Sequence, residues 1–282
     1  MDHVTVHLAA FWMAMSTLAL LAAIIPRLVF LIEHGKTMSQ REEDGGSVLK
    51  WDGSLLSAGS YTLARIKAFS VNKSWFLYFY IISVITCLFL IHIVGRESTG
   101  GNKVAVLSLF FLHSCRRLYE CIYVFKFGSS RMHVAGFIVG VVYYIAVPIT
   151  LWHEATEGEF PLFERKTAVG LLLFLCGNIA QSYFHWVLST GRSTSQTAEK
   201  RYIFPRGFGF DLVSCPHYTA EITLYAGLCL LIPDSVPMAA LLVWVVANLS
   251  VVARRSHEWY WATFPEEMKR ENERARILPF LY

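Results

Sequence analysis

Charged residues are scarce in this chain of 282 residues. Only 16% of the residues are Asp, Glu, Lys or Arg, whereas soluble domains contain about 25%. Because 55% of the residues are hydrophobic as well, the composition excludes a disordered chain, a nucleic-acid-binding domain and a secreted disulfide scaffold. The mean hydropathy of +0.44 favours a polytopic membrane protein.

Short motifs of common soluble sites are also missing. None of the six cysteines forms a Cys-x-x-Cys pair, and most lie in apolar runs, which is typical of small buried side chains rather than of metal ligands or disulfides. There is no Gly-x-Gly-x-x-Gly, no phosphate-binding loop, no His-Glu-x-x-His and no Gly-x-Ser-x-Gly. Any nucleotide would therefore be held by side chains within a helical bundle, and we expect no metal.

Seven long apolar segments predict an all-α, polytopic membrane protein with seven transmembrane helices in one bundle. A spanning helix needs about 20 mostly apolar residues. The third and fifth segments contain polar residues, and the sixth is short and is expected to extend back into the preceding segment. A single membrane domain, 1–282, is expected. The segments are 8–32, 75–94, 104–123, 134–152, 169–188, 218–232 and 236–252.

Lysine and arginine are distributed unevenly along this topology. With a lumenal N-terminus, 18 of the 25 basic residues fall in the cytosolic loops and the tail, and four fall in the lumenal loops. Basic residues are enriched on the cytosolic side of membrane proteins. We therefore predict a lumenal N-terminus and a cytosolic C-terminus, with a long cytosolic loop at 33–74 and a polar tail from Arg254 to Tyr282.

Polar side chains inside the predicted spans mark a possible site, because a charge at the bilayer centre costs about 2.5–3.5 kcal/mol. The first two of three groups have i, i+3, i+7 spacing and the third has i, i+4 spacing, so each shares a helix face. An internal network that only ties helices together is one interpretation. A cleft for an anionic ligand is the other, because adjacent arginines suit phosphate. The groups are His113, Arg116 and Glu120; Asn178, Gln181 and His185; and His217 and Glu221.

Further basic residues flank the spans on the predicted cytosolic side. Together with the intramembrane arginines they could form a phosphate-rich cofactor site that opens to the cytosol. A basic face attracted to anionic lipid is the alternative, and it suits Lys200 and Arg201. The flanking residues are Arg192, Lys200, Arg201, Arg206, Arg254 and Arg255.

Two C-terminal blocks resemble the signature of the steroid 5-alpha-reductase family. The tail reads His-Glu-Trp-Tyr at 257–260, Phe264 and Arg-Ala-Arg-Ile-Leu-Pro-Phe-Leu at 274–281, which is similar to the family's His-x-Trp-Tyr, Phe, Arg and terminal Ile/Leu-Pro-Phe. Residues 204–207 and 213–221 resemble its Ile-Pro-x-Gly and Val-Ser-x-Pro-Asn-Tyr-x-x-Glu block. The resemblance covers about 104–282.

Two earlier segments are similar to one branch of that family, the polyprenol (polyprenal) reductases of dolichol synthesis. These are Leu-His-Ser-Cys-Arg-Arg-Leu-Tyr-Glu-Cys at 112–121 and Trp-Phe-Leu-Tyr-Phe-Tyr-Ile-Ile-Ser at 75–83. The steroid-reducing branch has a Gln-Glu pair where this sequence has Tyr78-Phe79. This departure argues against a 3-oxo-steroid substrate.

The resemblance implies a multi-pass reductase of the endoplasmic reticulum membrane. It would use NADPH to saturate the alpha-isoprene double bond of polyprenal or polyprenol toward dolichol for protein N-glycosylation, with the isoprenoid lipid entering from the bilayer. The alternatives are a trans-2-enoyl-CoA or 3-oxo-steroid 4-ene reductase of the same family, a seven-helix transporter, or a membrane methyltransferase.

Residue by residue, the resemblance also suggests roles. For the donor to the substrate carbonyl we favour Tyr80 or Tyr78, followed by His113 and Tyr119, because a neutral hydroxyl can stabilise an oxyanion without the desolvation cost of an ion. Aromatic packing at the membrane interface is the alternative for both favoured tyrosines. The expected cofactor contacts are Arg116, Gln181, His185, Arg192, Tyr202, His217, Glu221, Arg254, Arg255, His257 and Tyr260.

Overall fold

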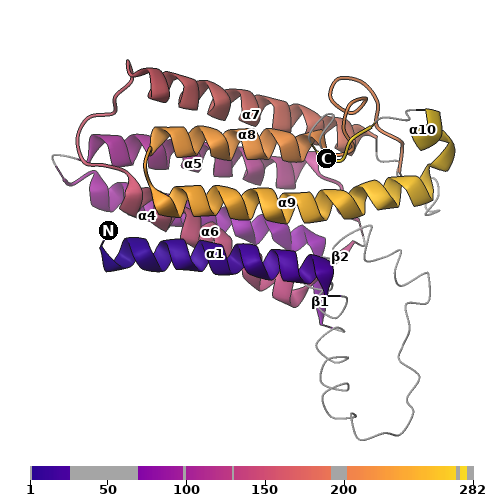
Figure 1. Cartoon of the computed structure of the whole chain (residues 1–282), viewed down its shortest axis with the longest axis horizontal. Coiled ribbons are helices and arrows are strands. Elements are labelled where there is room, and N and C mark those ends of the chain that lie inside the picture. Colours follow the sequence, from indigo (N-terminus) through magenta and orange to yellow (C-terminus); the bar gives the residue numbers. More distant parts are fainter. Residues whose placement is uncertain are drawn as a thin grey trace, which may run out of the picture.

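The computed structural model describes residues 2–25, 69–97, 100–128, 130–191, 202–270 and 274–277. These residues are mostly helical (Figure 1), which confirms the expected helical class. The helices are α1 (His3–Ile24), α4 (Phe76–Val94), α5 (Gly101–Tyr119), α6 (Val134–Glu154), α7 (Arg165–Thr190), α8 (Pro216–Leu231), α9 (Val236–Thr263) and the short α10 (Pro265–Arg270). The remaining elements are η2 (Lys73–Trp75), the wide turn η3 (Glu120–Val124), and the antiparallel strands β1 (Ser70–Asn72) and β2 (Arg131–His133).

Among the described residues, five helical stretches are long and apolar enough to cross a membrane. The seven predicted segments each contain a long helix, but α5 carries several polar residues and α8 has only 16 residues, so these two fall outside the group. The prediction of seven spans therefore stays a prediction at this point. The five stretches are His3–Ile24, Lys73–Val94, Val134–Glu154, Arg165–Thr190 and Val236–Thr263.

Several helix boundaries differ from the predicted ones. α1 starts at His3, where the Asp2 carboxylate accepts a hydrogen bond from Thr5 N at 2.7 Å, and it ends at Ile24. The predicted residues 26–32 lie outside the described residues. α8 extends back only to Pro216. The predicted tail does not begin at Arg254, because α9 continues as a helix to Thr263. Much of the predicted long loop, residues 33–68, lies outside the described residues.

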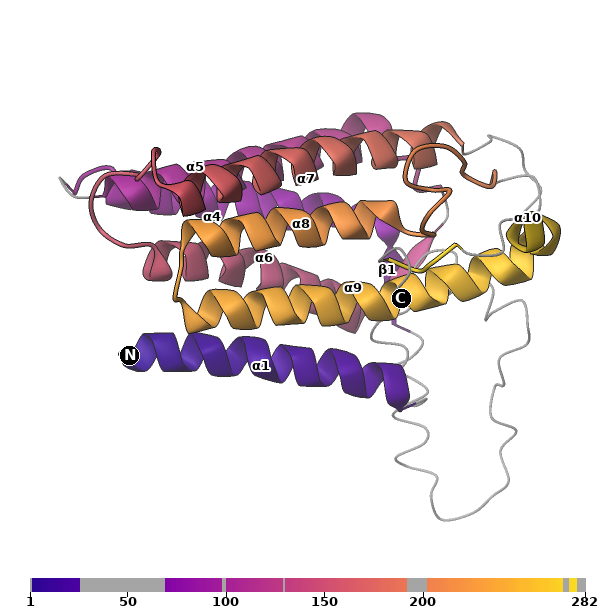
Figure 2. The same cartoon turned by 45° about the horizontal axis from the view of Figure 1, so that its top comes forward.

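The long helices run side by side in one bundle (Figures 1 and 2). α7 packs along α8, α1 packs along α9, and α4 packs between α5 and α6. The α7–α8 contact is close because glycines face it. A Cβ atom at Gly177 would lie 2.7 Å from the Ala220 carbonyl oxygen, and one at Gly227 would lie 2.6 Å from the Gly170 carbonyl oxygen. Small residues allow such backbone approach in membrane helices.

The two ends of the bundle carry different numbers of lysines and arginines. One end holds the N-terminus and the connections α4–α5, α6–α7 and α8–α9; the other holds β1, β2, α10 and the described part of the tail (Figures 1 and 2). The described basic residues at the first end are Arg96, Lys103, Arg165 and Lys166. Those at the second end are Lys73, Lys126, Arg131, Arg206, Arg254, Arg255, Lys269, Arg270, Arg274 and Arg276.

A buried carboxylate ties three helices together at the first end. Glu154, at the end of α6, accepts hydrogen bonds from Thr5 Oγ1 of α1 at 3.1 Å and from Ser235 Oγ, the cap of α9, at 2.6 Å. His153 Nδ1 lies 2.9 Å from the same carboxylate. This cluster stabilises the end of the bundle that lies far from the site described next.

Candidate active site

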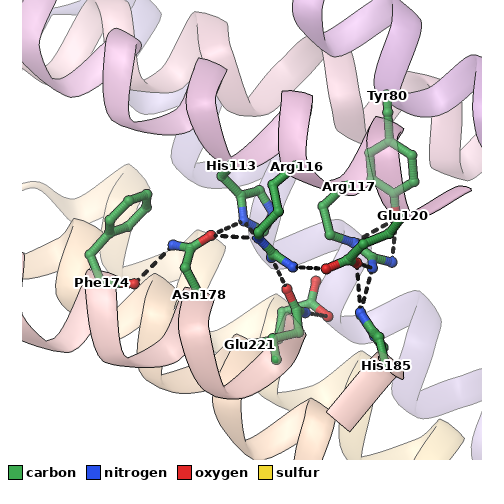
Figure 3. A network of polar contacts seen from close by, with 10 residues as sticks. Tyr80, His113, Arg116, Arg117, Glu120, Phe174, Asn178, His185 and Glu221 are labelled. Carbon is green, nitrogen blue, oxygen red and sulfur yellow. Dashed lines mark hydrogen bonds and ion pairs between the residues drawn. The ribbon is translucent and has the colours of Figure 1, made fainter. Parts of the chain in front are cut away.

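A polar network joins α4, α5, η3, α7 and α8 inside the bundle (Figure 3). Its centre is Glu120, whose side chain is 2% exposed. Glu120 forms ion pairs with both Arg116 and Arg117, and His185 Nδ1 lies 2.8 Å from its Oε2 atom. The polar residues predicted to share inward helix faces therefore meet, as their spacing indicated.

One arm of the network links Arg117 to Tyr80 on α4. Arg117 donates from NH2 at 2.7 Å and from Nε at 3.2 Å to the Tyr80 hydroxyl oxygen. The guanidinium also lies 5.0 Å from the centre of the Tyr80 ring and 5.3 Å from that of Phe125, within the range of cation–π attraction. These contacts hold the guanidinium in one orientation.

A second arm runs from Arg116 through α7 to α8. Arg116 donates to Gln181 and, at 3.2 Å, to Asn178 Oδ1. Gln181 Nε2 in turn donates to Glu221 Oε2 at 3.0 Å. His113 Nδ1 lies 2.9 Å from Asn178 Oδ1. Few backbone contacts join α5 and α7 directly, so these long polar side chains bridge the two helices.

The wide turn η3 places the groups that follow Glu120. Here Phe125 N–H donates to the Glu120 carbonyl, five residues back, at 2.8 Å. Such π-type turns are rare and often occur at functional sites. The turn brings the Phe125 ring against His185, with ring centres 5.1 Å apart.

A cavity of about 530 Å³ opens beside this network at the basic end of the bundle. Its wall is partly apolar, with aromatic side chains such as Phe76, Phe125 and Tyr218. Polar groups enter it from α5, α7, α8 and α9. The charged residues of the wall are Lys73, Arg117, Lys126, Arg206 and Glu221. Because four of these five are cations, the cavity suits a ligand that carries several negative charges.

The two C-terminal motif blocks meet at the rim of the cavity. Ser214 N donates to the Ala275 carbonyl at 2.8 Å, and Thr219 Oγ1 donates to the Ile277 carbonyl at 2.6 Å. His257 of α9 contacts Ser214 Oγ through Nδ1 at 2.7 Å. The described part of the tail therefore lies across the start of α8 and supports the cavity wall.

The residues expected to contact the cofactor lie in different places relative to the cavity. Arg116 and Gln181 lie behind the wall, where they support Glu221. His257 forms hydrogen bonds with Ser214 and Trp261. Arg254 forms an ion pair with Glu258. Neither Arg254 nor Arg255 lines the cavity. Arg192 lies outside the described residues. The expected contacts that line the cavity are His185, Tyr202, His217, Glu221 and Tyr260.

The four expected carbonyl donors also differ in position. Tyr80 is 4% exposed and contacts the cavity-lining Arg117. His113 is buried against Asn178. Tyr78 is 48% exposed and packs on Trp75, whereas Tyr119 is 58% exposed. The outward position of Tyr78 matches the aromatic-packing alternative, whereas the buried position of Tyr80 does not.

Sequence reasoning did not single out every residue of the wall. Arg117 was noted only as the neighbour of Arg116, although its i, i+3 spacing to Glu120 indicates the same helix face. Lys73 and Lys126 lie on different elements, and no local pattern in the sequence joins them. Tyr218 was visible only as part of the α8 motif.

Comparisons with known proteins agree with the motif resemblance. A sequence profile described as 3-oxo-5-alpha-steroid 4-dehydrogenase matches residues 132–282. The polyprenal reductase of Caenorhabditis elegans is 28% identical over 77% of this chain and 81% of its own length. The polyprenal reductase of Homo sapiens is 28% identical over 78% and 80%, and that of Saccharomyces cerevisiae is 26% identical over 96% and 92%.

Proposed function

Because the chain belongs to the 3-oxo-5-alpha-steroid 4-dehydrogenase family, we propose that it reduces the alpha-isoprene double bond of polyprenal with NADPH. The similarity to polyprenal reductases over most of the chain supports this substrate. The observation that carries the proposal is the cation-rich cavity beside the Arg117–Tyr80 pair. The product is the corresponding saturated aldehyde, on the way to dolichol and thus to N-glycosylation.

The donor set of the cavity fits a nicotinamide dinucleotide phosphate. Lys73, Lys126 and Arg206 supply positive charge for phosphate groups. His185 and Glu221 offer acceptors for ribose or amide donors, and Tyr202 offers an aromatic wall. From the sequence resemblance, Arg192 is also expected to bind phosphate.

Negative charge on the substrate must be stabilised during the reduction. When bound, NADPH supplies a hydride for the beta carbon of the conjugated aldehyde. Charge then moves to the aldehyde oxygen, and a proton added at the alpha carbon completes the saturation. Arg117 lies in the cavity wall with the Tyr80 hydroxyl at its side. We propose that this pair stabilises the aldehyde oxygen, with the Tyr80 hydroxyl donating a hydrogen bond to it and Arg117 neutralising the charge.

Water must be kept from the reacting aldehyde. Phe76, Phe125 and Tyr218 form an apolar part of the wall. A low-dielectric wall strengthens the attraction between the Arg117 guanidinium and the developing oxyanion. The isoprenoid tail remains in the bilayer, from which we propose that the substrate enters.

We also propose that all seven long helices cross the endoplasmic reticulum membrane, with the N-terminus in the lumen. α5 and α8 run alongside helices that are long and apolar enough to span (Figure 1). The greater number of lysines and arginines at the α10 end supports a cytosolic position for that end. This orientation opens the cavity toward the cytosol.

The test uses the purified full-length protein in lipid nanodiscs. NADPH is added with polyprenal, with a trans-2-enoyl-CoA or with a 3-oxo-steroid, and the loss of reduced nicotinamide is followed together with mass spectrometry of the product. We expect turnover with polyprenal and a saturated alpha-isoprene unit. Turnover of only the enoyl-CoA or the steroid would refute the substrate. Binding of S-adenosylmethionine but not NADPH would point to a methyltransferase.

A further inference from the structure

Glu120 is a buried carboxylate that holds two cavity-lining side chains without lining the cavity itself. It lies at the start of η3, pairs with Arg116 through Oε1 and contacts Arg117 and His185 through Oε2. Arg117 and His185 come from different helices, α5 and α7. One carboxylate therefore sets the relative position of two groups that face the ligand.

The contacts of His185 Nδ1 fix the position of the imidazole ring. This nitrogen lies 2.8 Å from Glu120 Oε2 and 2.6 Å from Arg117 NH1. It therefore faces both the carboxylate and the guanidinium that the carboxylate binds. Together these two partners hold the ring, which forms part of the cavity wall, in one orientation.

Glu120 also fixes the plane of the Arg117 guanidinium. NH1 of Arg117 bonds to Glu120, while Nε and NH2 bond to the Tyr80 hydroxyl. Because both edges of the planar guanidinium are held, its N–H groups that face the cavity can adopt few orientations. An arginine bound on one edge alone would rotate about its long side chain.

We propose that Glu120 is a positioning residue for cofactor binding, which presents Arg117 as a fixed cationic donor and holds the His185 ring in the cavity wall. The ligand groups that fit are an oxyanion or phosphate for Arg117 and a carboxamide or sugar hydroxyl for His185. This inference rests on the proposed function, because it assumes that NADPH occupies the cavity.

Two substitutions separate charge from shape at this position. Glu120→Gln keeps the shape but removes the charge, so the ion pairs with Arg116 and Arg117 are lost. Glu120→Asp keeps the carboxylate on a side chain that is one methylene shorter. Glu154→Gln is the control, because Glu154 is a buried carboxylate that also joins several helices but lies at the opposite end of the bundle.

The KM values for NADPH and polyprenal, kcat and the melting temperature are measured for each purified variant in nanodiscs. For Glu120→Gln we expect the KM for NADPH to rise at least about tenfold, the change expected from losing one charge-assisted hydrogen bond. The KM for polyprenal should change much less. Glu120→Asp should fall between Glu120→Gln and the unsubstituted protein. Glu154→Gln should lower the melting temperature and leave both KM values unchanged.

A merely structural role for Glu120 predicts a different result. Loss of folded protein lowers the maximal rate in proportion, but the remaining enzyme keeps its KM for NADPH. An unchanged KM in both Glu120 variants therefore overturns the inference while the proposed function stands. If the unsubstituted protein neither binds NADPH nor reduces polyprenal, the proposed function fails, and the inference fails with it.

Discussion

Replacing Tyr80 by phenylalanine removes one oxygen atom from the site and leaves the ring in place. That oxygen accepts two hydrogen bonds from Arg117, at 2.7 and 3.2 Å. If the hydroxyl also donates to the aldehyde oxygen in the transition state, its loss should lower kcat by about 100- to 1000-fold, or roughly 2.7–4 kcal/mol, as for other oxyanion donors. The KM for NADPH should rise less than in Glu120→Gln, because Arg117 loses its bonds to Tyr80 but keeps its bond to Glu120.

A hydroxyl that only supports Arg117 predicts a smaller kinetic effect. Its loss would leave two guanidinium donors without their acceptor and would cost about 1.5–3 kcal/mol of stability. The melting temperature would fall, while kcat would change by less than about tenfold, which corresponds to 1.4 kcal/mol. Kinetic and thermal measurements on the same sample therefore separate the two roles.

The assay follows NADPH consumption with polyprenal in nanodiscs, under single-turnover conditions if product release limits the rate. Tyr78→Phe is the matched control, because Tyr78 lies two residues away on the same helix and is 48% exposed. It should keep the kinetic constants of the unsubstituted protein. A kcat for Tyr80→Phe within about tenfold of the unsubstituted value would refute direct donation by Tyr80.

Three further outcomes are expected. Arg206→Ala should raise the KM for NADPH by about 10- to 100-fold through loss of a phosphate contact. Lys269→Ala, at the same end of the bundle but outside the cavity, should leave this KM unchanged. Equal effects of the two substitutions would refute a direct role of Arg206 in phosphate binding. Gly177→Leu should destabilise the fold by about 1–3 kcal/mol or more by overpacking, because even a Cβ atom there would lie 2.8 Å from Leu224 N. An unchanged melting temperature would contradict the close contact between α7 and α8. His257→Ala should abolish turnover while the protein still inserts into membranes, and normal turnover would show that the contact between His257 and Ser214 is dispensable.

Helix positions could be predicted well wherever local composition decides them. The apolar runs of α1, α4, α6, α7 and α9 are long because a bilayer requires them to be. The spacing of the polar residues on α5 and α7 correctly indicated that His113, Arg116 and Gln181 lie together inside the bundle. In both cases the information lies within about 20 consecutive residues.

Contacts between distant segments set the limits of prediction. α9 continues past Arg254 because Trp259 and Tyr260 are buried against Tyr202 and Phe204, which lie more than 50 residues earlier in the chain. The sequence favoured Tyr78 and Tyr80 equally as donors to the substrate carbonyl. They lie on different faces of one helix, and only the packing of α4 against α5 decides which of them points inward.

The length of α9 has a consequence for where the chemistry takes place. Its 28 residues span about 42 Å at 1.5 Å per residue, whereas the hydrocarbon layer is about 30 Å thick. In the proposed orientation, a helix that starts at the lumenal surface of this layer projects about 12 Å, or roughly two turns, beyond the cytosolic surface. These turns carry Trp259 and Tyr260. The distance of the cavity from the cytosolic membrane surface therefore depends on the thickness of the bilayer. If the proposed function holds, a membrane of different thickness shifts the place where a water-soluble cofactor meets a lipid-dissolved substrate.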